Sequence, residues 1–179
     1  MTHNFHDSNE KSLDAKMFPF WEKVYFELFG NDIEISKTIE DLEMQKKGID
    51  RIITLKNGKK YLIDEKVRFT DYDDILLEYL SAKETGSKGW IEKDLTIDYI
   101  LYAFNNKQVC YVLDYITLKR VWKYYGEQWK KKYKIVEAKN HFHSGIYTTV
   151  SVVIPTSVLL NVMKNASLID LKLIKSPVH

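Results

Sequence analysis

A predicted β-hairpin is the feature that most restricts how this chain can fold. Residues 49–55 are rich in β-branched side chains, and residues 61–69 form a second strand-like run. Between them lies Asn57-Gly58, and Asn-Gly between two such runs is a strong short-range signal for a tight antiparallel turn. The sequence therefore predicts two adjacent strands joined by a short turn.

Three charged residues of this hairpin are expected to converge. Side chains alternate between the two faces of a strand, so Asp64 and Lys66 point the same way and Glu65 points the other way. The hairpin brings the end of its second strand back beside Asp50, which stands at the start of the first strand. Two carboxylates and one ammonium are therefore expected within a small volume.

This predicted cluster has the composition of a divalent-metal site. Two neighbouring carboxylates repel each other unless a cation lies between them, and carboxylate oxygens suit hard ions such as Mg²⁺. A lysine beside such an ion can orient a water or stabilise negative charge on a phosphate. The alternative is that Asp50 and Asp64 are ordinary turn or strand-edge residues and that Lys66 pairs with one of them. We favour the metal site because Gly48-Ile49, the Asn-Gly turn and the apolar flanks all coincide with it.

The same residues resemble the signature of a known family. The pattern consists of Asp50, a hairpin and the run Asp64-Glu65-Lys66. It is similar to the signature of the PD-(D/E)XK, or restriction-endonuclease-like, nucleases of phages and bacteria. The resemblance covers about half of the chain. Its segments are Gln45 to Asp50, Asp64-Glu65-Lys66, Leu77-Glu78, Gly89-Trp90-Ile91 and Thr96-Ile97-Asp98-Tyr99.

The resemblance implies a metal-dependent nuclease. It implies that Asp50 and Asp64 bind Mg²⁺ or Mn²⁺ and that the main-chain carbonyl of Glu65 completes the ligand set. Lys66 is then the catalytic lysine, and Gln45 is a candidate supporting residue. The implied substrate is nucleic acid, with DNA favoured over RNA.

The chain departs from the family pattern in two places. Ile49 stands where the family name has proline, which leaves the following carboxylate unchanged. Many members supply a further acid from the first helix, and helical spacing does not decide between Asp14, Glu22 and Glu27 here. Each of these is better explained as a solvated surface acid than as a metal ligand. Glu78, inside an apolar strand-like run, is either a buried supporting acid or an outward-facing edge residue.

A basic, aromatic-rich segment follows the predicted strands. Residues 119–139 carry eight cations and two acids, although the whole chain has a formal net charge of only +2. Interleaved cations and aromatic rings can neutralise phosphates and stack on bases. The alternative is an amphipathic helix with its aromatic side chains turned inward, and both descriptions can hold together. The candidate nucleic-acid-binding residues are Lys119, Arg120, Lys123, Lys130, Lys131 and Lys132.

The remaining patterns predict one α/β domain. Residues 1–13 are polar and lack periodicity, so we expect a flexible tail followed by a single domain over residues 14–179. We expect a restriction-endonuclease-like arrangement, with a central mixed sheet of about four or five strands flanked by helices. Residues 36–47 are interpreted as a loop or short helix, and residues 86–89 as a loop. Further strands are expected over 96–104, 108–113 and 148–154, and over 74–82, where the Leu-Leu-Glu-Tyr-Leu core fits a helix equally well. Helices are expected over 18–29, 117–132 and 157–165, with Thr156 or Ser157 capping the last.

Composition limits the class of protein. No apolar run approaches the roughly 18–20 residues that span a bilayer, and residues 1–6 lack the pattern of a secretory signal. Cys110 is the only cysteine, which excludes an internal disulfide and a cysteine-based zinc site. His141 and His143 are more simply explained as exposed loop residues than as metal ligands. We expect a cytoplasmic protein of a bacterial or phage-infected cell with no membrane partner, and a homodimer is left open.

Two other functions are alternatives to the nuclease. One is a catalytically silent nucleic-acid-binding module of the same fold, which has no reason to retain Asp50, Asp64 and Lys66 together. The other is a metal-independent protein-interaction domain, which requires that the basic segment be buried.

Overall fold

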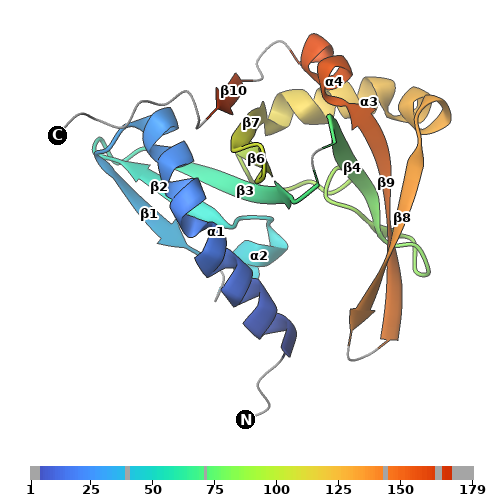
Figure 1. Ribbon diagram of the computed structural model, residues 1–179, viewed down its shortest axis with the longest axis horizontal. Helices are drawn as coiled ribbons and strands as arrows, with labels where there is room; N and C mark the ends of the chain where they lie inside the picture. Colours follow the sequence, from blue (N-terminus) through green and yellow to red (C-terminus); the bar gives the residue numbers. More distant parts are fainter. Residues whose placement is uncertain (1–4, 39–40, 71, 143–144, 164–166, 171–179) are drawn as a thin grey trace.

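The computed structural model describes residues 5–38, 41–70, 72–142, 145–163 and 167–170. Within these ranges the chain forms four helices and two β-sheets (Figure 1). None of the helices in these ranges is long and apolar enough to cross a membrane. The helices are α1 (Phe5–Phe29), α2 (Leu42–Lys46), α3 (Tyr115–Lys132) and α4 (Thr156–Val162).

The larger sheet contains the predicted hairpin. Its strand order is β1-β2-β3-β6-β7-β10, and its central pair, β3 with β6, is the only parallel one among the described strands. Ile53 pairs with Tyr61 across the hairpin, and Gly58 in the turn has a φ of +82°, which glycine adopts without strain. The strands are β1 (Ile33–Lys37), β2 (Arg51–Leu55), β3 (Lys60–Arg68), β6 (Tyr99–Phe104), β7 (Val109–Asp114) and β10 (Ser167–Asp170).

The smaller sheet is antiparallel, in the order β5-β4-β9-β8. Parallel strands need a long crossover connection, and here the connection from β3 to β6 passes through β4 and β5 of this second sheet. Figure 1 shows β4, β9 and β8 on the opposite side of β3 from α1. The strands are β4 (Asp74–Ala82), β5 (Ser87–Lys88), β8 (Ile135–Phe142) and β9 (Gly145–Pro155).

Two apolar cores lie on opposite faces of the larger sheet. Strand alternation separates them: on β6, Leu101 packs in the core with α1, whereas Ile100 and Tyr102 pack in the core with α3, α4 and the second sheet. The first core takes the apolar stripe of α1, where Trp21 and Tyr25 are fully buried. Each such side chain contributes roughly 1.5–3 kcal/mol by its removal from water.

Helix α3 covers the second core with its aromatic face. The Asp114 carboxylate accepts a hydrogen bond from the Thr117 N–H at 2.7 Å and caps the helix. Leu118, Trp122 and Trp129 are buried, so most of the basic residues lie on the remaining surface of the helix. The predicted inward orientation of these rings is confirmed.

Most of the predicted elements are confirmed. The hairpin, the strand over residues 74–82, the β6–β7 hairpin, β9 and α3 all occur within a few residues of their expected bounds. The mixed α/β class and the single domain are confirmed as well, with the fold built from two sheets. The restriction-endonuclease-like arrangement stays a prediction.

The predicted tail is wrong for residues 5–13, which form the first turns of α1; residues 1–4 lie outside the described ranges. No glycine or proline precedes Pro19 in this helix, so nothing in the backbone stops it from extending towards the N-terminus. The expected cap on α4 is also wrong, because neither Thr156 nor Ser157 makes a capping hydrogen bond. The expected end of that helix, residues 164–165, lies outside the described ranges.

The expected central mixed sheet is present, but it has six strands among the described residues rather than four or five, and the second sheet was not expected. Strands β1, β5 and β8 lie at sheet edges, in segments that were interpreted as loops or given no assignment. Edge strands are short, charged or irregular, and their pairing depends on a partner strand rather than on their own residues. The local pattern therefore could not predict them.

Gly89 lets the chain after β5 pack directly against the backbone of β4. Its N–H donates to the Tyr79 carbonyl at 2.9 Å, at a bulge in β4. A Cβ at this position would lie 2.6 Å from the carbonyl carbon of Glu78, so Gly89→Ala must displace the β4 backbone. We expect a loss of about 1–3 kcal/mol, as for other overpacked sites, measured by urea denaturation. Lys88→Ala, the exposed neighbour, is the control, and equal stability of both variants would contradict the contact.

Candidate functional site

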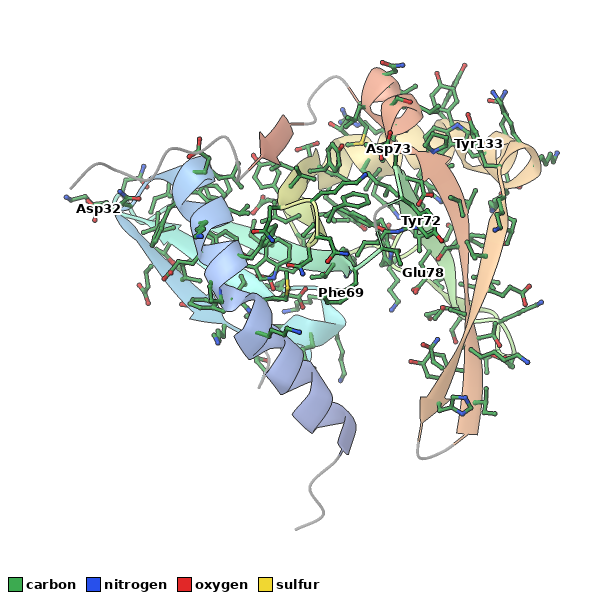
Figure 2. The ribbon with its side chains drawn as sticks, viewed as in Figure 1. Asp32, Phe69, Tyr72, Asp73, Glu78 and Tyr133 are labelled. Carbon is green, nitrogen blue, oxygen red and sulfur yellow. The ribbon has the colours of Figure 1, made fainter. Side chains whose placement is uncertain are left out.

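A cavity of about 450 Å³ lies between the two sheets and collects the predicted residues. Asp50, Asp64 and Lys66 line it from the hairpin, Glu78 lines it from β4, and Gln45 lines it from α2. Figure 2 shows Glu78 between β3 and the strands β8 and β9. The structure thus brings together five residues that are separated by up to 33 positions in the chain.

Strand alternation directs the hairpin acids into this cavity. Ile63 packs in the core with α1, so Asp64 and Lys66 face the opposite side of the sheet. The Asp50 N–H donates to the Ile63 carbonyl at 2.8 Å, which continues the ladder of β2 by one residue. Asp50 therefore lies beside Asp64 on the same face, as the sequence predicted.

The pKa of the Asp50 carboxyl group is raised well above its ordinary value. Its Oδ2 accepts the Glu65 N–H at 2.8 Å. Burial and the nearby charge of Asp64 raise the pKa of Asp50 from 3.8 to about 7, although Lys66 opposes this shift. Ionisation of both Asp50 and Asp64 is therefore unfavourable.

Asp64 has one oxygen that the protein itself does not satisfy. The side chain is only 2% exposed, and its Oδ1 accepts a hydrogen bond from Lys66 Nζ. Its Oδ2 is buried and receives no hydrogen bond from an N–H or hydroxyl donor within the described part of the chain, although the Asp50 carboxyl, when protonated, hydrogen-bonds to the Asp64 side chain. A buried carboxylate oxygen without a partner costs stability, and a hard cation is the natural group to satisfy it.

Lys66 carries a positive charge into the cavity. Burial lowers the pKa of its ammonium, but the carboxylates of Asp64 and Asp50 outweigh burial, and the net shift is upward from 10.5. Burial also raises the pKa of Glu78, with Lys66 opposing the shift. Because its pKa is raised, Lys66 in the metal-free protein is an electrostatic group rather than a proton acceptor at neutral pH.

A second polar cluster lies behind the site, on the face of the sheet that packs against α1. Tyr25 donates its hydroxyl hydrogen to Glu65 Oε1, and Arg51 Nε lies 3.4 Å from the same oxygen. Arg51 Nη1 also donates to the Asp50 carbonyl at 2.9 Å. Burial raises the pKa of Glu65 to about 7, against the opposing effects of Arg51 and Tyr25. This cluster ties α1 and β2 to the backbone that carries the two acids.

Sequence reasoning did not identify Tyr25 and Arg51. Helical periodicity places Tyr25 in the apolar stripe of the helix expected over residues 18–29, and a cation at the start of a β-branched strand is the signal that could have identified Arg51. Within the described part of α1, Tyr25 contributes a phenol to this region. Glu22 and Glu27 do not line the cavity, and the side chain of Asp14 lies outside the described part of the structure.

The six candidate nucleic-acid-binding residues of α3 fall into two groups. Lys119 donates to the carbonyls of Ile91 and Lys93, and Lys130 pairs with Glu127 at 2.5 Å and lies over the Trp122 ring. These two lysines are held by the chain itself. The other four are exposed and are Arg120, Lys123, Lys131 and Lys132.

No histidine cluster competes with this site. His141 is exposed on β8, and His143 lies outside the described residues. Among the described side chains, no group of three or more His, Cys, Asp and Glu is arranged to hold a metal ion.

Comparison of the chain with protein-family models, curated proteins and solved structures gave no match. The functional interpretation therefore rests on the site itself.

The buried pair of Arg51 and Glu65 is expected to be structurally essential. The side chains of Arg51 and Glu65 are 2% and 9% exposed, so Arg51→Ala leaves the buried Glu65 carboxylate without this counter-charge. We expect a loss of about 3–5 kcal/mol in the free energy of unfolding, measured by urea denaturation. Lys56→Ala, which removes an exposed pair with Asp32, should cost less than about 1 kcal/mol. A small effect of Arg51→Ala would show that the pair is dispensable.

The raised pKa values predict how stability depends on pH. Asp50 and Glu65 bind protons more tightly in the folded protein, with pKa values of about 7, than in the unfolded chain, where they are 3.8 and 4.5. Their stabilising contribution is complete below these unfolded values and is lost as pH rises to about 7. In EDTA, the stability of Asp50→Asn relative to wild type should therefore increase over this window. Parallel curves for Asp50→Asn and wild type would contradict the shift.

Proposed function

We propose that this chain is a divalent-metal-dependent nuclease that hydrolyses phosphodiester bonds of nucleic acid, with DNA favoured over RNA. Asp50 and Asp64 are the proposed ligands of Mg²⁺ or Mn²⁺, and Lys66 is the proposed catalytic lysine. The resemblance of these residues to the PD-(D/E)XK signature and their shared position in one cavity both support the proposal.

The observation that carries the proposal is the unsatisfied Oδ2 of Asp64. It lies in a cavity that also receives Asp50, whose raised pKa reports the cost of a second charge there. The main-chain carbonyl of Glu65 is the proposed third oxygen ligand, because the N–H of the same residue already donates to Asp50. This donor set suits a hard divalent cation, which keeps solvent in its remaining positions.

The residues of the chain have distinct roles in this proposal. Asp50 and Asp64 hold the cation, which when bound supplies Lewis-acid stabilisation of the charge on a phosphodiester. Lys66 remains protonated and stabilises the negative charge that develops on the phosphate oxygens. Glu78 faces Lys66 across the cavity and helps to keep the ammonium in place.

The exposed cations of α3 fit a nucleic-acid partner. Lys131 and Lys132 end the helix, and Arg120 and Lys123 lie nearer its start. Such groups neutralise phosphates without reading the base sequence. The proposal therefore predicts binding that weakens steeply as salt is raised.

The decisive experiment measures cleavage of single-stranded, duplex and branched DNA and RNA in Mg²⁺, Mn²⁺ or EDTA. We expect cleavage that requires metal and that Asp64→Asn reduces to background. Lys66→Ala should lower the rate by about 100-fold or more, because it removes one charge that stabilises the transition state. Binding of Mn²⁺, followed by electron paramagnetic resonance, should weaken in Asp64→Asn independently of any activity.

Lys56→Ala is the matched control for Lys66→Ala, because Lys56 is an exposed lysine in the turn of the same hairpin. It should retain the wild-type rate. Full activity of Asp64→Asn would disprove the assignment. Retained nucleic-acid binding without cleavage under any metal would instead support the catalytically silent module.

A further inference from the structure

A second cavity, also of about 450 Å³, adjoins the candidate site. It lies between residues 94–98, which precede β6, and the first half of α3. Its apolar lining includes Leu62, Ile97 and Tyr115, and Leu95 borders both this cavity and the one with the acids. A ligand in the second cavity would therefore lie next to the metal-binding carboxylates.

The wall between the two cavities is held rigidly. The Tyr115 hydroxyl accepts the Leu95 N–H at 3.1 Å and donates to the Lys93 carbonyl at 2.7 Å. Lys119 Nζ donates to the Lys93 carbonyl at 2.7 Å and to the Ile91 carbonyl at 3.1 Å. The cavity is therefore formed before any ligand arrives, which reduces the entropy cost of binding.

The rim of this cavity is positively charged and available. Arg120 and Lys123 line it, are exposed, and form no ion pair with any residue in the described ranges. Two acids also line the cavity: Asp98 accepts the Leu62 N–H at 2.7 Å, and the exposed Asp94 lies 3.4 Å from Lys119, so the lining has three cations against two acids.

These features match the chemistry of a nucleotide. An apolar cavity of this size takes a planar ring, and cations at its mouth take the phosphate attached to that ring. Ile116, which is 60% exposed, also lines the cavity and offers the ring further apolar surface. A base can enter such a cavity only after it leaves the helical stack, and this step costs least in single strands, ends and mismatches.

We propose that this cavity binds one unstacked base of the strand that is cut, with Arg120 and Lys123 on its phosphates. The substrate class is then single-stranded or frayed nucleic acid rather than intact duplex. This inference rests on the proposed nuclease function for its biological meaning, but base binding is measurable without catalysis. A purely electrostatic surface, in contrast, would bind duplex at least as well, because duplex carries the denser charge.

The test measures binding in EDTA by fluorescence anisotropy. The probes are an oligodeoxythymidylate of about 15 nucleotides, the order of length that one small binding site covers, and a duplex of equal length. Wild type should prefer the single strand. Ile116→Glu places a negative charge at the cavity, in the first turn of α3 where an acid suits the helix. It should weaken single-strand binding about 10-fold or more and abolish the preference.

A pair of double variants separates the cavity from general charge. Arg120→Ala/Lys123→Ala should weaken the single strand more than the duplex. Lys131→Ala/Lys132→Ala, at the other end of α3, should weaken both probes alike and leave the preference intact. Photocrosslinking with 5-iododeoxyuridine in the single strand should label Tyr115, which lines the cavity.

Each outcome bears on one proposal separately. Equal affinity for the two probes, no binding of either, or wild-type single-strand binding by Ile116→Glu would overturn the base-binding cavity, whatever the cleavage assay shows. Single-strand preference and the Tyr115 crosslink without metal-dependent cleavage would support the cavity and disprove the nuclease.

Discussion

Two hydrogen bonds at the open end of the β2–β3 hairpin set the position of the candidate site: the Asp50 N–H donates to the Ile63 carbonyl, and the Glu65 N–H donates to the Asp50 carboxylate. Together they place Asp50 beside Asp64 on the face opposite α1. Because side chains alternate along a strand, a shift of the hairpin by one residue would turn Asp64 and Lys66 into the core below α1. The turn at Gly58 and the apolar residues of both strands prevent that shift.

The protein accepts an electrostatic cost at this place. One oxygen of Asp64 is buried without a described partner, and Asp50 has a pKa of about 7 because ionisation beside Asp64 is unfavourable. Lys66 offsets only part of this cost. Local conflicts of this kind concentrate at functional sites, where a ligand completes the arrangement. Behind the site, Tyr25 donates a hydrogen bond to the buried Glu65, and Arg51 forms an ion pair with it.

The second sheet converts the acidic hairpin into a cavity. Strand β4 of this sheet lies beside the hairpin and contributes Glu78 to the cavity wall. Gly89 packs closely against β4, and the next residue, Trp90, also lines the cavity. The chain then returns through residues 91–98 to β6, and this segment separates the acidic cavity from the apolar one beside α3. The same crossover connection that makes β3 and β6 parallel therefore supplies the walls of both cavities.

The sequence by itself determined the hairpin, the shared face of Asp64 and Lys66, the approach of Asp50 and the amphipathic character of α3. These features follow from turn chemistry and side-chain periodicity, which act over a few residues and can be recognised locally. Only the tertiary structure decided that Glu78 faces the site, that Tyr25 and Arg51 support Glu65 from behind, and that β1 and β8 form strands. Each of these features depends on a contact with a residue that is distant in the chain. Such a contact cannot be inferred from the residues that are adjacent in the sequence.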